Sequence, residues 1–164
     1  MKSQRGSFRM PKHEELSQPN TKDAFRSARK PGGEALCPRC GSVYKRGRWS
    51  AGPAPRNPRL LHCPACRRTR EQLPAGYVNL SGQFLSGHRE EIVGLMRRCE
   101  AAERSRHPLE RIMAIEDSAG GVQVTTTGTH LAQRIGHALR SAYRGAVSMR
   151  YGGGETLLRV SWRR

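Results

Sequence analysis

The stretch "CPRCGSVYKRGRWSAGPAPRNPRLLHCPAC", residues 37–66, contains two Cys-x-x-Cys pairs, Cys37/Cys40 and Cys63/Cys66. A two-residue spacer lets both sulfurs of a pair turn toward one ion, and the glycine directly after the first pair permits the tight turn of a zinc knuckle. The second pair, in "HCPACRR", repeats this layout. Four thiolates at about 2.3 Å around one Zn²⁺ make a closed tetrahedral site. The segment therefore predicts a zinc ribbon with these four cysteines as the metal ligands.

Other uses of the cysteines stay open at this point. The 22 residues between the pairs slightly exceed the roughly 15–20 that are usual for such sites. We expect "AGPAPRNP", residues 51–58, to loop out of a two-stranded ribbon without disturbing it. A redox Cys-x-x-Cys would need one pair rather than two, an iron–sulfur cluster is not excluded by the basic surroundings, and His62 is an alternative ligand.

A closed site with four protein ligands offers no coordination position to water, so we expect a structural metal and no enzymatic activity. A segment as short as residues 36–70 cannot bury enough apolar area to fold alone, and zinc binding on the order of 10–16 kcal/mol offsets that deficit. A nuclease would need convergent acids, and only Glu116 with Asp117 offers them. Neighbouring residues of a strand point to opposite faces, which argues against that pair.

The charge of the chain indicates a polyanionic partner. Lys and Arg total 30 against 13 Asp and Glu, for a formal net charge of +17 at pH 7. Residues 37–70 contain nine of the basic residues and no acidic one. Four thiolates and one Zn²⁺ would balance only two of these charges. Nucleic acid is the commonest polyanion, and the mixture of basic and aromatic residues in "VYKRGRW" suits phosphate contacts with base stacking.

The candidate RNA-binding residues form two groups. Alternative roles stay open for both, because a charged helix face is usually only solvated and an aromatic residue such as Trp49 can cover the small core of a ribbon. The first group lies in the cysteine segment and the second on one face of a predicted helix: Arg39, Lys45, Arg46, Arg48, Trp49, Arg67 and Arg68, then Arg134, Arg140 and Arg144.

Composition divides the chain into four regions. Residues 1–35 are polar, with no apolar period, and predict a disordered basic tail. The zinc ribbon occupies residues 36–70. Pro74, Gly76 and Gly82 mark residues 71–85 as a linker. Residues 86–164 form an α+β domain. Since only 35% of the residues are hydrophobic, we expect small modules rather than one large core.

The α+β domain is predicted from its apolar periodicity. A helix begins near Ser86, ends before Pro108, and has a buried stripe of apolar residues that includes Cys99. Residues 110–116 and 121–127 predict one hairpin, and residues 147–151 and 156–162 predict another. Between them lies a helix capped by Thr129, with a buried stripe at Leu131, Ile135, Ala138, Leu139 and Ala142. The fold class is therefore α+β: a small four-cysteine zinc ribbon followed by a helix and a ββαββ unit with an antiparallel or mixed sheet.

We expect a cytoplasmic protein. The chain has no run of about 18 apolar residues, and its N-terminus lacks the apolar middle region of a secretory signal. Paired cysteines in a reducing compartment favour metal binding over disulfides.

The order of these features resembles a known family. A ribbon that begins with "CPRCG", then a helix, then the unit "IEDSAGGVQVTTTGTHLAQRIGHAL", is similar to the N-terminal part of the large-subunit ribosomal export adaptor family and its short prokaryotic relatives. The resemblance covers roughly residues 36–162 and implies attachment to ribosomal RNA or the ribosome. It also implies zinc binding by the four cysteines and supplies no catalytic residue. The alternative function is that of a zinc-ribbon transcription factor that binds DNA or RNA polymerase.

Overall fold

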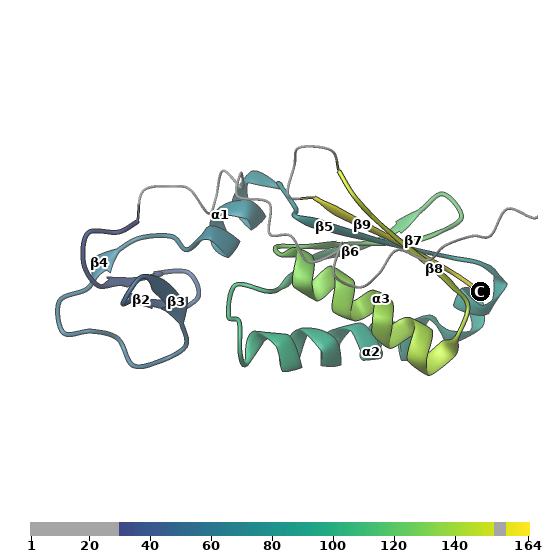
Figure 1. The fold of residues 1–164 in the computed structure, drawn as a ribbon, viewed down its shortest axis with the longest axis horizontal. Coiled ribbons are helices and arrows are strands. Elements are labelled where there is room, and N and C mark those ends of the chain that lie inside the picture. The colour runs from purple at the N-terminus through teal and green to yellow at the C-terminus, as the bar shows by residue number, and fades with distance from the viewer. Residues whose placement is uncertain (1–29, 153–156) are drawn as a thin grey trace, which may run out of the picture.

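The structure is a computed structural model, and it describes residues 30–152 and 157–164 (Figure 1). Most of the predicted tail, residues 1–29, lies outside the described residues. The described chain has two parts, which we call the ribbon lobe (residues 35–72) and the sheet domain (residues 76–164). Each part contains helix and strand, so the predicted α+β class is confirmed.

The ribbon lobe is built on a small sheet with the strand order β3-β2-β1-β4. The central pair β1 and β2 is antiparallel, whereas β1 and β4 are parallel. The two-stranded ribbon that the sequence predicts is thus extended by a strand on each side, and residues 51–58 form the connection from β3 to β4 as expected. The strands are β1 Ala35–Leu36, β2 Val43–Lys45, β3 Arg48–Ser50 and β4 Arg59–Leu60.

The ribbon lobe ends in a helix that the sequence did not predict, α1 Pro64–Glu71. Cys63 is its N-cap residue, because its sulfur accepts a hydrogen bond from the Cys66 N–H, and proline suits the first helical turn. The second Cys-x-x-Cys pair therefore differs from the first, since it lies at the start of a helix and not in a knuckle.

The sheet domain has a five-stranded mixed sheet with the strand order β6-β7-β5-β9-β8. The central strands β5 and β9 are parallel, and every other neighbouring pair is antiparallel. The two predicted hairpins, β6–β7 and β8–β9, are present within two residues of their expected bounds. The strands are β5 Gly76–Ser81, β6 Ile112–Ser118, β7 Gly121–Thr126, β8 Ala146–Tyr151 and β9 Leu158–Arg163.

The predicted linker at residues 71–85 is wrong, because it contains the central strand β5. The glycines that suggested a linker are instead close-contact positions. A Cβ at Gly76 would overlap the side chains of Thr126 and Ala132, and Gly82 has φ +105° with the Arg164 carbonyl against its Cα. Only glycine fits at either place. Glycine at these two positions therefore allows the chain to pass close to its neighbours just where the central strand β5 begins and ends.

Two helices cover one face of this sheet, α2 Gln83–Arg104 and α3 Thr129–Tyr143 (Figure 1). The predicted apolar stripes are confirmed at Ile92 and Met96 on α2, and at Leu131, Ile135 and Leu139 on α3, all fully buried. Fifteen buried side chains form one core here, with Val78, Val160 and Trp162 supplied by the central strands.

Two details of the helix predictions are wrong. Ala142 is exposed, because the apolar stripe of α3 continues from Leu139 to the partly buried Tyr143 and not to Ala142. Helix α2 begins at Gln83 rather than near Ser86. Its first turn is separated from the rest by a kink at His88 (φ −128°, ψ 19°), where the imidazole stacks on Phe84 with 3.7 Å between ring centroids. Along the described residues, no helix combines the length and apolar character needed to cross a membrane.

Candidate metal centre

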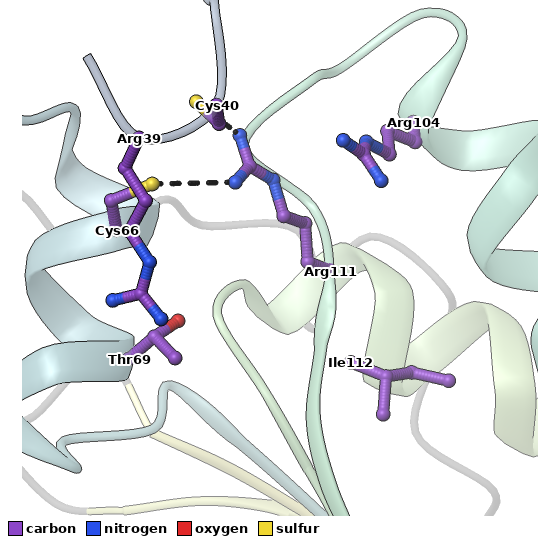
Figure 2. Close-up of a pocket in the computed structure, with 7 residues that line it drawn as sticks. All are labelled: Arg39, Cys40, Cys66, Thr69, Arg104, Arg111 and Ile112. Carbon is purple, nitrogen blue, oxygen red and sulfur yellow. Dashed lines mark hydrogen bonds between the residues drawn. The ribbon is translucent and has the colours of Figure 1, made fainter. Parts of the chain in front are cut away.

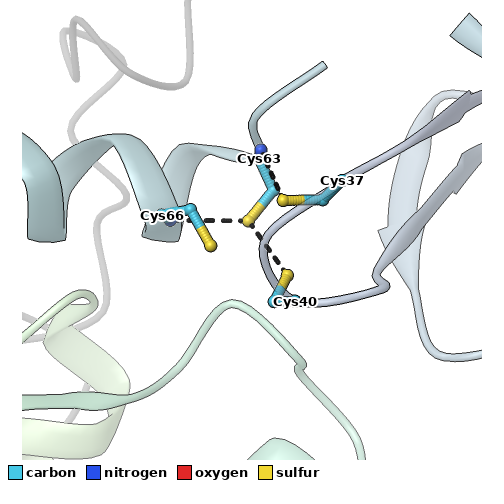
Figure 3. Close-up of side chains that lie close together, drawn as sticks. All are labelled: Cys37, Cys40, Cys63 and Cys66. Carbon is cyan, nitrogen blue, oxygen red and sulfur yellow. Dashed lines mark hydrogen bonds between the residues drawn. The ribbon is translucent and has the colours of Figure 1, made fainter. Parts of the chain in front are cut away.

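The four cysteine sulfurs converge between the knuckle and the start of α1, as Figure 3 shows. All four Sγ atoms lie within 4.8 Å of one another, and those of Cys40 and Cys63 are 3.6 Å apart. Sulfurs at about 2.3 Å from a central ion at tetrahedral angles would be about 3.8 Å apart, and a disulfide would need about 2.05 Å. The arrangement therefore fits one tetrahedral metal ion, and soft thiolates favour a thiophilic metal such as Zn²⁺.

Short backbone hydrogen bonds place the ligands. Gly41 (φ +72°) closes the knuckle by donating its N–H to the Cys37 carbonyl at 2.9 Å. The N–H of Cys63 donates to the Cys37 sulfur, and the N–H of Cys66 donates to the Cys63 sulfur, each at 3.4 Å. These bonds stabilise negative charge on the sulfurs, as the N-terminus of α1 also does.

Arg111 of the sheet domain completes the site, although the sequence analysis missed it. Figure 2 shows its guanidinium between two of the ligands: Nη2 is 3.0 Å from the Cys40 sulfur and Nη1 is 3.4 Å from the Cys66 sulfur. Its Nε donates to the Pro108 carbonyl at 2.8 Å, and this bond fixes the orientation of the forked guanidinium group. Arg111 lies 45 residues after Cys66, and no local pattern distinguishes it from the other arginines.

The electrostatics of the centre depend on this arginine and on the metal. Burial opposes ionisation of Cys40, but hydrogen bonds with Ser42 and Arg111 lower the pKa of this thiol to about 6. Burial opposes the charge on Arg111 as well, yet the Cys40 thiolate raises the pKa of the guanidinium. Burial raises the pKa of the Cys63 and Cys66 thiols. A bound cation would therefore be needed to keep these two thiols deprotonated.

Replacing Arg111 by methionine is expected to weaken metal binding about 10- to 100-fold, because partners that hydrogen-bond metal ligands typically contribute this much. Arg111→Lys keeps the charge but loses the fork, so it should recover only part of the affinity. Competition with a chromophoric chelator measures the affinity, and Arg98→Met on the exposed surface of α2 is the matched control. Parental affinity in Arg111→Met would show that the contact is incidental.

A cavity of about 410 Å³ lies beside the metal centre, between the ribbon lobe and the sheet domain (Figure 2). Three of its lining residues are arginines from separate places: Arg39 in the knuckle, Arg104 in the last turn of α2, and Arg111 just before β6. None of its lining residues in the described part of the chain is acidic. Among the described residues, neither Arg39 nor Arg104 has an ion-pair partner. The full lining is Arg39, Cys40, Cys66, Thr69, Arg104, Arg111 and Ile112.

The other candidates of the ribbon lobe have different surroundings. Arg46 and Arg48 are exposed at the turn between β2 and β3. Lys45 forms an ion pair with Glu34 at 2.8 Å, and Arg67 lies 3.9 Å from Glu71. The remaining candidate, Trp49, packs partly buried on the cysteine cluster, and its ring is 5.4 Å from the buried ring of the neighbouring tyrosine. The aromatic pair thus covers the small core, which was the alternative role.

Arg68 does not belong among the exposed cations. Arg68 is only 7% exposed. Its Nη1 donates to the Leu73 carbonyl at 3.1 Å, just beyond the end of α1. A buried guanidinium with a backbone partner stabilises the helix end. Arg68 is therefore not an exposed cation that RNA could contact, because its side chain is buried and hydrogen-bonded just beyond α1.

The helix candidates are spread along α3 rather than gathered at the ribbon lobe. The start of α3 lies near the metal centre, because the Leu131 N–H donates to the carboxylate of Glu110, the residue before Arg111. Arg134 pairs with Glu103 at 2.9 Å. Arg140 and Arg144 are exposed at the opposite end of α3. The structure therefore does not gather the two groups of candidates into one surface.

The possible acid pair Glu116 and Asp117 is also divided. Glu116 pairs across the sheet with Gln123, whereas Asp117 pairs with the buried Val122 and forms an ion pair with Arg89 at 3.0 Å. The two carboxylates do not converge.

No protein-family model, curated protein or solved structure matches the chain. The function must therefore be argued from the site itself.

Proposed function

We propose that the protein binds RNA and attaches to ribosomal RNA or the ribosome, with Zn²⁺ as a structural ion. The observation that carries this proposal is the cavity beside the metal centre, where Arg39, Arg104 and Arg111 meet with no acidic residue in the lining. Gathering three guanidinium groups costs repulsion, and the metal centre offsets only part of it with a net charge of −2. A phosphate group supplies the remaining negative charge, and arginine binds it with paired hydrogen bonds.

Exposed cations extend the basic surface of the ribbon lobe beyond this cavity. Arg46, Arg48, Arg56 and Arg59 are exposed, and none has an ion-pair partner among the described residues. A metal bound by the four cysteines would cross-link the short lobe and so restrict the backbone that positions these four arginines and Arg39. The metal thus acts through the scaffold: it fixes a rigid group of cations that an RNA backbone can contact without a large loss of entropy.

The proposal assigns no catalytic role to the centre. Four cysteine ligands leave no position for a reacting water, and the sulfurs of Cys40 and Cys66 are hydrogen-bonded to Arg111 rather than to a general base. The resemblance to the ribosomal export adaptors agrees with this reading, since it implies attachment to the ribosome through a zinc ribbon.

The proposal predicts a steep dependence of ribosome and RNA binding on salt. Each phosphate contact releases counterions, so about five contacts should give a log–log slope near roughly −4. The triple variant Arg46→Glu/Arg48→Glu/Arg59→Glu should abolish co-sedimentation with ribosomes at physiological salt while metal content stays at the parental value. The matched control, Arg97→Glu/Arg98→Glu/Arg106→Glu, makes the same change in net charge on exposed residues outside the ribbon lobe that are not candidate RNA contacts.

Three outcomes separate the alternatives. Loss of binding in the ribbon variant alone supports the proposal. Equal loss in both triple variants would show a response to net charge and not to a site. Binding to duplex DNA or to RNA polymerase in preference to ribosomes would contradict the proposal and favour the role of a transcription factor.

A further inference from the structure

The sheet domain exposes one whole face of its sheet. Helices α2 and α3 lie on the other face, and no described element covers this one (Figure 1). We call it the open face. It consists of the outward-pointing residues of the four strands β7, β5, β9 and β8: Gln123 and Thr125, then Tyr77, Asn79 and Ser81, then Arg159, Ser161 and Arg163, then Ser148 and Arg150.

Strand register arranges the open face in rows. Tyr77, Arg159 and Arg150 lie side by side across β5, β9 and β8. The guanidinium carbon of Arg159 lies over the Tyr77 ring, 5.1 Å from its centroid, so a cation already contacts one face of this ring and the opposite face is the one for a base. In the next row, the Gln123 amide donates to Asn79 Oδ1 at 2.9 Å. This bond leaves the Asn79 amide N–H groups and the Gln123 carbonyl oxygen for an outside partner.

The charges of the open face indicate an anionic partner. Arg150 and Arg159 are direct cross-strand partners, and like charges in that position destabilise a sheet. Neither arginine has an ion-pair partner among the described residues, and Arg163 adds a third exposed cation two rows away. The one acidic residue on this face of the described strands is Glu116. It lies on the edge strand β6, and β7 and β5 separate it from the arginines.

Ordinary solvation does not account for this pattern. Antiparallel sheets commonly leave one face in water, and cross-strand pairs of opposite charge then stabilise them. Here the paired positions have two arginines, with a tyrosine beside them on the central strand. An aromatic ring for stacking, amides for hydrogen bonds and cations for phosphates are the groups with which proteins bind unpaired nucleotides.

We propose that the open face binds an unpaired segment of RNA, with one base stacked on Tyr77 and its backbone phosphates held by Arg150 and Arg159. A single strand fits better than a duplex, because only unpaired bases offer a free ring face and free hydrogen-bonding edges. Asn79 and Gln123 then contact the edge of the neighbouring base. The proposal rests on the proposed function and names the form of RNA that the sheet domain recognises.

The position of Tyr77 would allow one RNA strand to run from the ribbon lobe onto the open face. Tyr77 is the second residue of β5, and only the short segment from Gln72 to Ala75 separates that strand from α1. The row with the tyrosine is therefore at the end of the sheet next to the ribbon lobe, so one RNA can contact the basic ribbon lobe and the open face together.

The test uses the full-length, metal-loaded protein and a labelled 12-nucleotide oligouridine, with fluorescence anisotropy as the readout. Stacking of one base contributes about 5- to 140-fold in affinity, so Tyr77→Ala should weaken binding by that factor and Tyr77→Phe should stay within about twofold. Arg150→Gln/Arg159→Gln should reduce the magnitude of the salt slope by about 1.4, because two phosphate contacts are lost. Arg97→Gln/Arg98→Gln on α2 is the control with the same charge removed.

A second measurement uses the parental protein, so it does not require any variant to fold. The same oligonucleotide is prepared with iodouridine and cross-linked to the protein by ultraviolet light. A cross-link in the peptide that contains Tyr77 supports the proposal. Parental affinity in Tyr77→Ala and in the double arginine variant would overturn it, even while the ribbon variant loses ribosome binding and the proposed function stands. Binding of a hairpin duplex without binding of the single strand would also overturn the proposal. A parental protein that binds neither the single strand nor ribosomes would contradict both proposals.

Discussion

Removal of the metal is expected to unfold the ribbon lobe and to leave the sheet domain folded. One buried cluster of the lobe consists of Cys37, Cys63, Cys66 and Ala65, so three of its four members are candidate metal ligands. The other buried apolar residues of the lobe are Ala35, Val43 and Tyr44, which are too few to form a large core. Apparent zinc binding on the order of 10–16 kcal/mol exceeds what a lobe of this size can lose and remain ordered. The sheet domain has its own core around Val78, Trp162 and the two long helices, and no cysteine of the metal centre contributes to it.

Native mass spectrometry should find one Zn²⁺ per chain, and a chelator or Cys63→Ser should remove it. Amide signals of residues 35–72 should then collapse toward random-coil positions in an NMR spectrum, while those of the strands β5–β9 persist. Cys99→Ser is the matched control, because Cys99 is a buried cysteine of α2 outside the metal cluster. A metal-free protein with an ordered ribbon lobe, or iron in place of zinc, would contradict the prediction.

Leu139→Asp is expected to unfold the sheet domain. Leu139 is fully buried on α3, between that helix and the sheet. An isolated carboxylate at this position costs several kcal/mol, which is comparable with the roughly 5–15 kcal/mol by which a domain is stable. Circular dichroism at 25 °C should show loss of most helix signal and no cooperative thermal transition.

Two substitutions in the same helix serve as controls. Ile135→Leu keeps the volume and apolar character of a fully buried side chain, so it should cost less than about 1.5 kcal/mol. Ala142→Asp places the same carboxylate three residues after Leu139 but on the exposed surface, where we expect a change within about 0.5 kcal/mol. If Leu139→Asp melts like the parent, or if Ala142→Asp unfolds the domain, the buried face of α3 has been misassigned.

Features that depend on neighbouring residues could be predicted from the sequence. The two-residue spacer brings a pair of cysteines to one ion, so the four ligands and the knuckle glycine were found before any fold was known. The stripe of Leu131, Ile135 and Leu139 follows from the helical period, and the two hairpins follow from alternation around glycine turns. Each of these signals lies within a short continuous segment, such as residues 112–126 or 146–163 for the hairpins, and needs no knowledge of the rest of the chain.

Features that depend on contacts between distant residues could not be predicted from the sequence. The strand β5 is only six residues long and has glycines at and beside its ends, and its central place follows from pairing with β7 and β9, far away in the chain. The role of Arg68 depends on a helix that begins at a metal ligand. The sequence predicted an exposed cation at that position, and packing at the end of α1 decided otherwise.

The candidate site shows the same division. The sequence by itself determined that four cysteines can hold one metal ion within a basic segment, because spacing and charge are properties of the chain. Tertiary structure alone decided that Arg111 lies against the sulfurs of Cys40 and Cys66, and that Arg150 and Arg159 face each other beside Tyr77. The physical reason is the separation in sequence. The two cysteines of a pair lie within one turn of the chain, so their spacing alone brings them together. The contacts of Arg111, Arg150 and Arg159 join distant segments, so they form only after the strands have paired in their final register.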